Sequence, residues 1–100
     1  MTENTIRIVL VDDDPLVRAG LGLILGGSPD LEVVAEAADG VEAVQVVAEH
    51  KPDIVLMDIR MPRRDGIAAT AEILARPDAP RVVVLTTFDR VLVYDRAGAL

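Results

Sequence analysis

The chain has 100 residues, which is enough for one folded domain and too few for two. Its 17 acidic and 10 basic residues give a formal charge of −7, which disfavours binding to nucleic acid phosphates and to anionic lipid. The absence of cysteine excludes disulfides, thiol nucleophiles and cysteine-ligated zinc, and a single histidine disfavours a histidine-based metal cluster or catalytic triad.

The hydrophobic core must be aliphatic, because aromatic residues make up only 2% of the chain. The apolar residues are mainly 15 Val, 13 Ala, 11 Leu and 7 Ile. This composition favours buried parallel strands that are covered by helices rich in small residues.

The N-terminal part of the chain predicts one strand followed by one helix. Residues 6–11 form a short β-branched run that stops abruptly at three aspartates, as a buried strand does when it reaches solvent. Asp14 and Pro15 then supply a helix N-cap and a first-turn proline. Apolar residues recur at helical spacing after them, until Gly26 and Gly27 end the helix.

A second strand and a second helix follow in the same order. Residues 31–38 form the strand. Asp39 and Glu42 have the spacing of a capping box, which predicts the start of a helix, and the apolar residues that follow lie on one helical face. Pro52 separates this helix from the next strand.

The second half of the chain repeats the alternation. Residues 53–58 are a third apolar run that again ends in an acid, and Asp65 and Gly66 start a third helix. Residues 81–87 form a fourth strand. Residues 89–100 are poorly periodic, and we expect at most a short fourth helix there.

The order of these elements predicts an α/β fold. A chain in which strands alternate with helices forms right-handed crossovers, which build a parallel sheet with helices on both faces. In such a sheet the carboxyl ends of all the strands lie at one edge, and ligands bind at this edge in open α/β folds.

Four reactive side chains are expected at this edge. They are Asp12 and Asp13 after the first strand, Asp58 at the end of the third and Thr86 near the end of the fourth. If the first and third strands are neighbours, three carboxylates converge, and each close pair repels by about 4 kcal/mol at an effective dielectric constant near 20. A cation would relieve this repulsion, and ligands that are all oxygen atoms point to Mg²⁺.

Asp58 is the best candidate for a nucleophile toward phosphorus. It stands alone at a strand end, whereas Asp12 and Asp13 are adjacent and better placed to hold metal. A carboxylate beside Mg²⁺ can attack phosphorus, because the metal neutralises the incoming charge. The hydroxyl of Thr86 would then be placed to donate a hydrogen bond to a phosphoryl oxygen.

Four motifs stand at fitting separations along the chain. They are Val-Asp-Asp-Asp-Pro at 11–15, Leu-Met-Asp-Ile-Arg-Met-Pro at 56–62, Asp-Gly at 65–66 and Leu-Thr-Thr-Phe-Asp at 85–89. Together they resemble the receiver domain of bacterial two-component response regulators, in particular the NarL/LuxR-type transcriptional regulators. The resemblance covers nearly the whole chain, and it implies a flavodoxin-like (CheY-like) sheet with the strand order 2-1-3-4-5.

The resemblance also implies a role for each residue of the site. Asp58 would accept a phosphoryl group from the phosphohistidine of a sensor histidine kinase, and Asp12 and Asp13 would be the acidic pair that binds Mg²⁺. Arg60 would contribute its backbone carbonyl to the metal, and Thr86 would be the switch hydroxyl. The chain would then be a phosphoacceptor switch with at most weak self-dephosphorylation, and not a turnover enzyme.

The chain departs from the family after its fourth strand. Receivers continue into a fifth strand, a lysine that contacts the phosphoryl group and a fifth helix, and the regulators add a DNA-binding effector domain. We expect residues 1–100 to be a receiver domain that lacks these parts. The single lysine, Lys51, lies where no interpretation places it in the site.

This departure has a structural consequence. Without a fifth strand, the fourth strand is expected to be an unpaired apolar edge, and the first helix is expected to cover its face of the sheet alone. A homodimer, formed through the fourth strand or by exchange of elements, would pair this strand edge and cover this face of the sheet. DNA binding would belong to the effector domain.

Two other functions stay open. A degenerate receiver that only dimerises or docks is favoured by the missing lysine. An aspartate-nucleophile phosphohydrolase is suggested by Asp12 and Asp14 after the first strand, but that class needs a lysine, a further acidic pair and a longer chain. The joint spacing of Asp12, Asp13 and Asp58 favours the phosphoacceptor receiver.

The sequence also predicts where the protein works. No uninterrupted apolar run approaches the roughly 20 residues of a membrane span. The N-terminal residues lack the charged and apolar regions of a signal peptide. We therefore expect a cytoplasmic protein without membrane contact.

Overall fold

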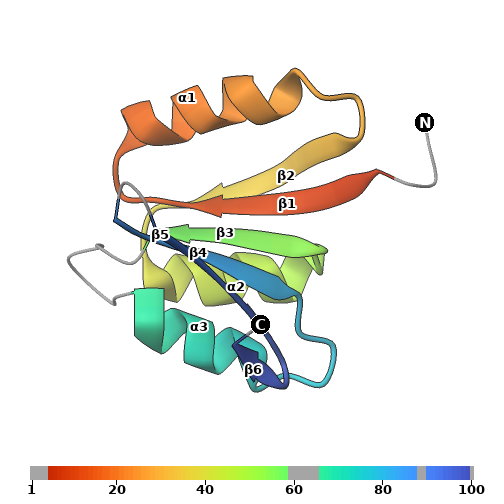
Figure 1. Ribbon diagram of the computed structural model, residues 1–100, viewed down its shortest axis with the longest axis vertical. Helices are drawn as coiled ribbons and strands as arrows, with labels where there is room; N and C mark the ends of the chain where they lie inside the picture. The colour runs from red at the N-terminus through yellow and green to blue at the C-terminus, as the bar shows by residue number, and fades with distance from the viewer. Residues whose placement is uncertain (1–4, 59–65, 88–89, 100) are drawn as a thin grey trace.

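The computed structural model describes residues 5–58, 66–87 and 90–99, and these ranges contain one six-stranded sheet and three helices (Figure 1). The strands are β1 (Ile6–Val11), β2 (Leu31–Ala37), β3 (Ile54–Asp58), β4 (Arg81–Thr87), β5 (Arg90–Asp95) and β6 (Gly98–Ala99). The helices are α1 (Pro15–Gly26), α2 (Gly40–His50) and α3 (Gly66–Leu74). The predicted alternation of strands and helices is confirmed as far as β4.

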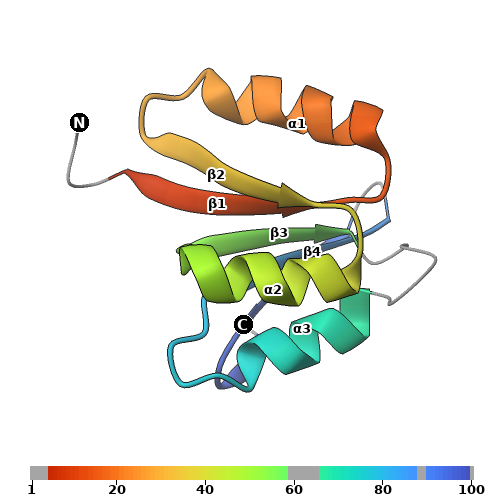
Figure 2. The same ribbon diagram turned by 180° about the vertical axis from the view of Figure 1, so that it is seen from behind.

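The strands lie in the order β2-β1-β3-β4-β5-β6. The first four strands of the chain are parallel, whereas β5 is antiparallel to β4 and β6 is antiparallel to β5. In both views α1 lies on one face of the sheet, and α2 and α3 lie on the other (Figure 1 and Figure 2). The predicted parallel sheet with helices on both faces is therefore confirmed. Within the described residues, no helix has the length and apolar character needed to cross a membrane.

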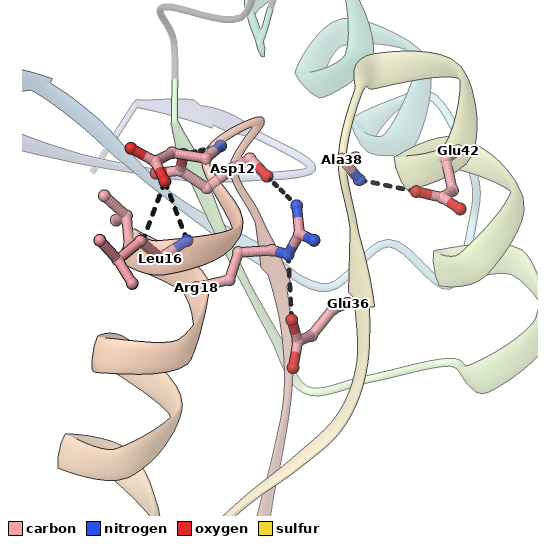
Figure 3. A network of polar contacts seen from close by, with 8 residues as sticks. Asp12, Leu16, Arg18, Glu36, Ala38 and Glu42 are labelled. Atoms are coloured by element: carbon pink, nitrogen blue, oxygen red, sulfur yellow. Dashed lines mark hydrogen bonds and ion pairs between the residues drawn. The ribbon is translucent and has the colours of Figure 1, made fainter.

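The predicted caps start the first two helices. The Asp14 carboxylate accepts a hydrogen bond from the backbone N–H of Leu16 at 2.8 Å. In α2 the backbone N–H of Glu42 donates to Asp39 Oδ1 at 2.8 Å. Glu42 Oε1 accepts from the backbone N–H of Ala38 at 2.6 Å (Figure 3). These contacts satisfy N–H groups that the first turn of a helix and the segment before it leave unpaired.

The buried core lies between the sheet and the helices α2 and α3. It consists of alternate residues of the strands and of small or branched residues of the two helices: Val9, Val11, Ala37, Val55, Met57, Val82, Val84, Ala43, Val47, Ala69 and Ile73. Alternate residues of a strand point to the same face, so each strand contributes a short row to this layer. Ala43 and Ala69 are fully buried, and their small side chains allow both helices to pack closely on the strands.

The opposite face of the sheet carries α1 alone among the described helices (Figure 1). No residue of α1 is buried, and Leu16, Leu23 and Ile24 are 80, 81 and 73% exposed. The leucines at positions 21 and 25 are half-buried. The outward side of α1 is therefore apolar, as expected for a helix that covers its face of the sheet without a neighbour.

The C-terminal segment does not form the short helix that was expected for residues 89–100. In its described part, β5 pairs with β4, with Val93 opposite Val83 and Leu92 opposite Val84. The valines and the tyrosine of β5 favour a strand, and pairing satisfies the edge of β4. The expectation that β4 is an unpaired edge is therefore wrong, because β5 occupies that edge.

The turn between β5 and β6 depends on glycine at position 98. Gly98 has a φ of +125°, which a residue with a side chain rarely adopts. We expect Gly98→Ala to weaken the β5–β6 hairpin by about 1–3 kcal/mol. Amide hydrogen exchange in β5 measures this effect, and unchanged exchange rates would contradict the hairpin.

Gly20 provides a control of opposite sign. It lies within α1, and no described atom outside its own helix lies within 4 Å of an added Cβ. Alanine costs less conformational entropy than glycine in a helix, so Gly20→Ala should raise the free energy of unfolding by about 0.5–1 kcal/mol. Urea denaturation measures this change.

Candidate functional site

Asp12 and Asp58 lie at the same edge of the sheet because β1 and β3 are neighbours. β1 and β3 are parallel and adjacent, and Val11 lies opposite Met57. Asp12 follows Val11, and Asp58 follows Met57 as the last residue of β3. Both carboxylates are thus attached at the same level of the carboxyl edge of the sheet, as the sequence predicts.

Three carboxylates meet at this edge. One oxygen from each of Asp12, Asp13 and Asp58 can be chosen so that all three lie within 4.8 Å of one another. Asp12 and Asp58 are only 7% exposed, whereas Asp13 is exposed. The predicted convergence is confirmed, and two of the three charges are held largely away from water.

This environment changes the acidity of Asp12. Burial raises the pKa of its carboxyl above the ordinary value of 3.8, and the nearby charges of Asp58, Asp13 and Asp14 raise it further. A hydrogen bond of 2.9 Å from the backbone N–H of Asp14 to Asp12 Oδ1 acts in the opposite direction. The folded protein thus holds this proton to a higher pH than the unfolded chain does. Ionisation of Asp12 therefore lowers the stability as the pH rises above the ordinary value.

Arg18 of α1 holds the end of β1 in place. Its Nη1 donates a hydrogen bond to the backbone carbonyl of Asp12 at 2.6 Å, and its Nε forms an ion pair with Glu36 Oε1 of β2 at 3.0 Å (Figure 3). The sequence reasoning missed this residue. A signal was present, because a basic residue near the N-terminal end of a helix is opposed by the helix dipole and needs another reason to be there.

The acids line a cavity at the surface. Its volume is about 330 Å³, and its walls are Asp12, Asp13, Asp14, Val17 and Asp58. Carboxylate oxygens at this spacing are the donors that a hard divalent cation prefers. The donor set therefore fits Mg²⁺, and the cavity leaves space beside the acids for a phosphoryl group.

Three other residues were named in the sequence analysis: Thr86 and Arg60 as parts of the site, and Lys51 as a residue outside it. Thr86 lies in β4 next to Leu85, the residue that pairs with Asp58 across the sheet, while its side chain is outside the described part of the chain. Arg60 lies outside the described residues altogether. Lys51 lies at the other edge, since its backbone carbonyl accepts a hydrogen bond of 3.1 Å from Arg7 near the start of β1.

Comparisons with known proteins agree with this geometry. The model of the response regulator receiver domain family matches residues 8–98. The transcriptional regulatory protein LiaR of Bacillus subtilis is 45% identical over 98 residues, which are 95% of this chain and 46% of LiaR. The chain thus spans about half the length of this relative.

Two solved structures show the same fold. A LuxR-family two-component response regulator from Aurantimonas sp. SI85-9A1 is 45% identical, with a TM-score of 0.75 over 80% of this chain and 57% of that one. The CheX–CheY complex of Borrelia burgdorferi with BeF3 and Mg²⁺ gives 32% identity and a TM-score of 0.73 over 79% of this chain and 60% of that one.

The family model spans most of the chain, and the relative and the solved structures share its sequence and fold. The matches include a transcriptional regulatory protein and a LuxR-family two-component response regulator, and a receiver domain is not a classical enzyme. The acid cluster stands where the strand order predicts a ligand site. This chain belongs to the response regulator receiver domain family.

Proposed function

We propose that the chain accepts a phosphoryl group on Asp58 from a sensor histidine kinase, with Mg²⁺ as the cofactor. In a longer protein, this step would control dimerisation and transcription through an effector domain. The observation that carries the proposal is the convergence of three carboxylates, two of them buried, on one cavity of about 330 Å³. The kinase as partner and a cytoplasmic location stay predictions.

Asp12, Asp13 and Asp58 are the proposed metal ligands, together with the backbone carbonyl of Arg60. When bound, Mg²⁺ would neutralise the carboxylates and the charge of the incoming phosphoryl oxygens. The hydrogen bond from the backbone of Asp14 orients the carboxylate of Asp12, and Arg18 fixes the backbone that carries it. The CheY complex of Borrelia burgdorferi, crystallised with BeF3 and Mg²⁺, supports this proposal.

Asp58 is the proposed nucleophile because of its position. It ends β3, so its backbone is held by the parallel neighbours β1 and β4. A carboxylate oxygen of Asp58 forms a bond to phosphorus while the bond from phosphorus to the kinase histidine breaks. The electron pair of that bond stays with the imidazole nitrogen, which is neutralised by a proton from water. The hydroxyl of Thr86 is proposed to donate a hydrogen bond to the transferred group.

A degenerate receiver is the second candidate. The only lysine of the chain is Lys51, and it lies at the edge opposite the acids. Within residues 1–100, no lysine can therefore balance the phosphoryl charge. The phosphohydrolase alternative is weaker, since the Asp14 carboxylate is engaged as the cap of α1 through the backbone N–H of Leu16.

Metal binding is tested by thermal unfolding. At Mg²⁺ ten times its Kd, linkage gives about 1.4 kcal/mol of stabilisation, or a rise in Tm of about 6–11 °C for a domain of this size. We expect Asp12→Asn to lose this rise and to have a higher Tm than the original chain in EDTA, because one converging charge is removed. Glu49→Gln, an exposed change on α2, should keep the full rise. The site is wrong if Mg²⁺ leaves the Tm of the original chain unchanged.

Phosphotransfer is tested by intact-mass measurement after incubation with acetyl phosphate and Mg²⁺. We expect one phosphate on the original chain and none on Asp58→Asn, because Asp58 is the proposed nucleophile. Asp78→Asn removes an exposed acid near the other edge and should still be phosphorylated. The absence of phosphate from every variant, with the Mg²⁺ effect on Tm intact, would favour the degenerate receiver.

The homodimer is proposed to form by exchange of the β5–β6 hairpin. Residues 88 and 89 alone separate β4 from β5, and short connections between paired elements favour exchange between copies. An exchanged hairpin would keep the pairing of β4 with β5. Light scattering at micromolar concentration should give the mass of two chains. Insertion of a flexible Gly-Ser segment after residue 88 should give the mass of one, and a monomeric original chain would rule out this dimer.

A further inference from the structure

The side chain of Arg18 joins α1 to the ends of two neighbouring strands (Figure 3). Its Nη1 donates to the carbonyl of Asp12, the residue after β1, at 2.6 Å, and its Nε donates to Glu36 Oε1 of β2 at 3.0 Å. Leu10 lies opposite Glu36, so both partners lie near the carboxyl edge of the sheet. The side chain of Arg18 is 19% exposed, and water therefore competes little for these two hydrogen bonds.

Asp12 is held at three points. Its backbone N–H donates to the carbonyl of Ala37 in β2 at 3.1 Å, and its backbone carbonyl accepts from Arg18. Its Oδ1 accepts from the backbone N–H of Asp14 at 2.9 Å. The donor in Arg18 is charged, and charge-assisted hydrogen bonds are roughly twice as strong as neutral ones. Loss of Arg18 would therefore free the backbone that carries the carboxylate of Asp12.

The positive charge of Arg18 is unfavourable beside a site for a cation. It repels Mg²⁺, and near the N-terminal end of α1 the helix dipole also opposes it. Loss of the charge alone would therefore strengthen Mg²⁺ binding, whereas loss of the hydrogen bond to Asp12 would weaken it. The sign of the change in Mg²⁺ affinity separates an electrostatic role of Arg18 from a positioning role.

We propose that Arg18 and Glu36 are positioning residues for Asp12 and that they raise the affinity of the acid cluster for Mg²⁺. This inference rests on the proposed function, since it takes Asp12 as a metal ligand. The carboxylate of Glu36 fixes the guanidinium of Arg18, and the guanidinium fixes the carbonyl of Asp12. Groups that orient a metal ligand without touching the metal change metal affinity by about 10–100-fold when they are lost.

Calorimetric titration with MgCl2 tests this inference. Arg18→Met keeps the length of the side chain and removes its donors, and it should weaken Mg²⁺ binding about tenfold. Arg18→Lys keeps the charge but lacks the planar fork that holds both partners, so its affinity should lie between those of Arg18→Met and the original chain. An affinity in Arg18→Met that equals or exceeds that of the original chain would overturn the inference.

Two further changes separate positioning from general stability. Glu36→Ala should weaken Mg²⁺ binding about threefold, the effect of a partly exposed ion pair. Because Glu36 acts through Arg18, the double variant with Arg18→Met should bind no more weakly than Arg18→Met alone. Val47→Ala opens a cavity in the core formed with α2 and α3 and lowers the stability, but it should leave the Mg²⁺ affinity unchanged. Additive losses, or an equal loss in Val47→Ala, would contradict the positioning role.

Amide hydrogen exchange in EDTA gives a readout without the ion. The N–H of Asp12 should exchange about tenfold faster in Arg18→Met, while that of Val9 at the centre of β1 should change less. Equal acceleration at both residues would indicate a loss of overall stability and overturn the inference. If the original chain does not bind Mg²⁺, the proposed metal site is wrong and this inference with it. If the original chain binds Mg²⁺ and Arg18→Met binds it equally, the positioning role alone is wrong.

Discussion

The parallel alignment of β1 with β3 is the constraint on which the site depends. The pairing of Val11 with Met57 sets Asp12 and Asp58 at one level of the sheet. The two acids are far apart in sequence, and their mutual repulsion opposes folding. Burial of apolar residues such as Val9, Val55 and Met57 supplies the free energy that keeps these strands together.

Asp14 links the first helix to the acid cluster. Its carboxylate caps α1, while its backbone N–H donates to the carboxylate of Asp12. Arg18, one turn into the same helix, bonds the backbone of Asp12 from the other side. The start of α1 therefore positions a proposed metal ligand with one side chain and one backbone group.

The elements that could be predicted from the sequence are those whose start or end is marked by residues close together in the chain. Strands that end in acids, caps at Asp14 and Asp39, and the alternation of strands with helices were enough for the parallel sheet and the acid cluster. The segment after β4 was predicted wrongly, because its valines fit either a short helix or a strand until β4 offers an edge to pair with. The ion pair of Arg18 with Glu36 depends on a contact between elements distant in sequence, which periodicity does not reveal.

The outward leucines and isoleucine of α1 have a consequence for how copies of the molecule behave toward one another. The helix exposes a hydrophobic surface formed by Leu16, Leu23 and Ile24. The formal charge of −7 makes copies repel at neutral pH, and this repulsion fades as the pH approaches the isoelectric point near 4.5. Self-association through α1 is thus opposed by electrostatic repulsion between copies more than by polar side chains on this helix. Acid or high salt weakens this repulsion.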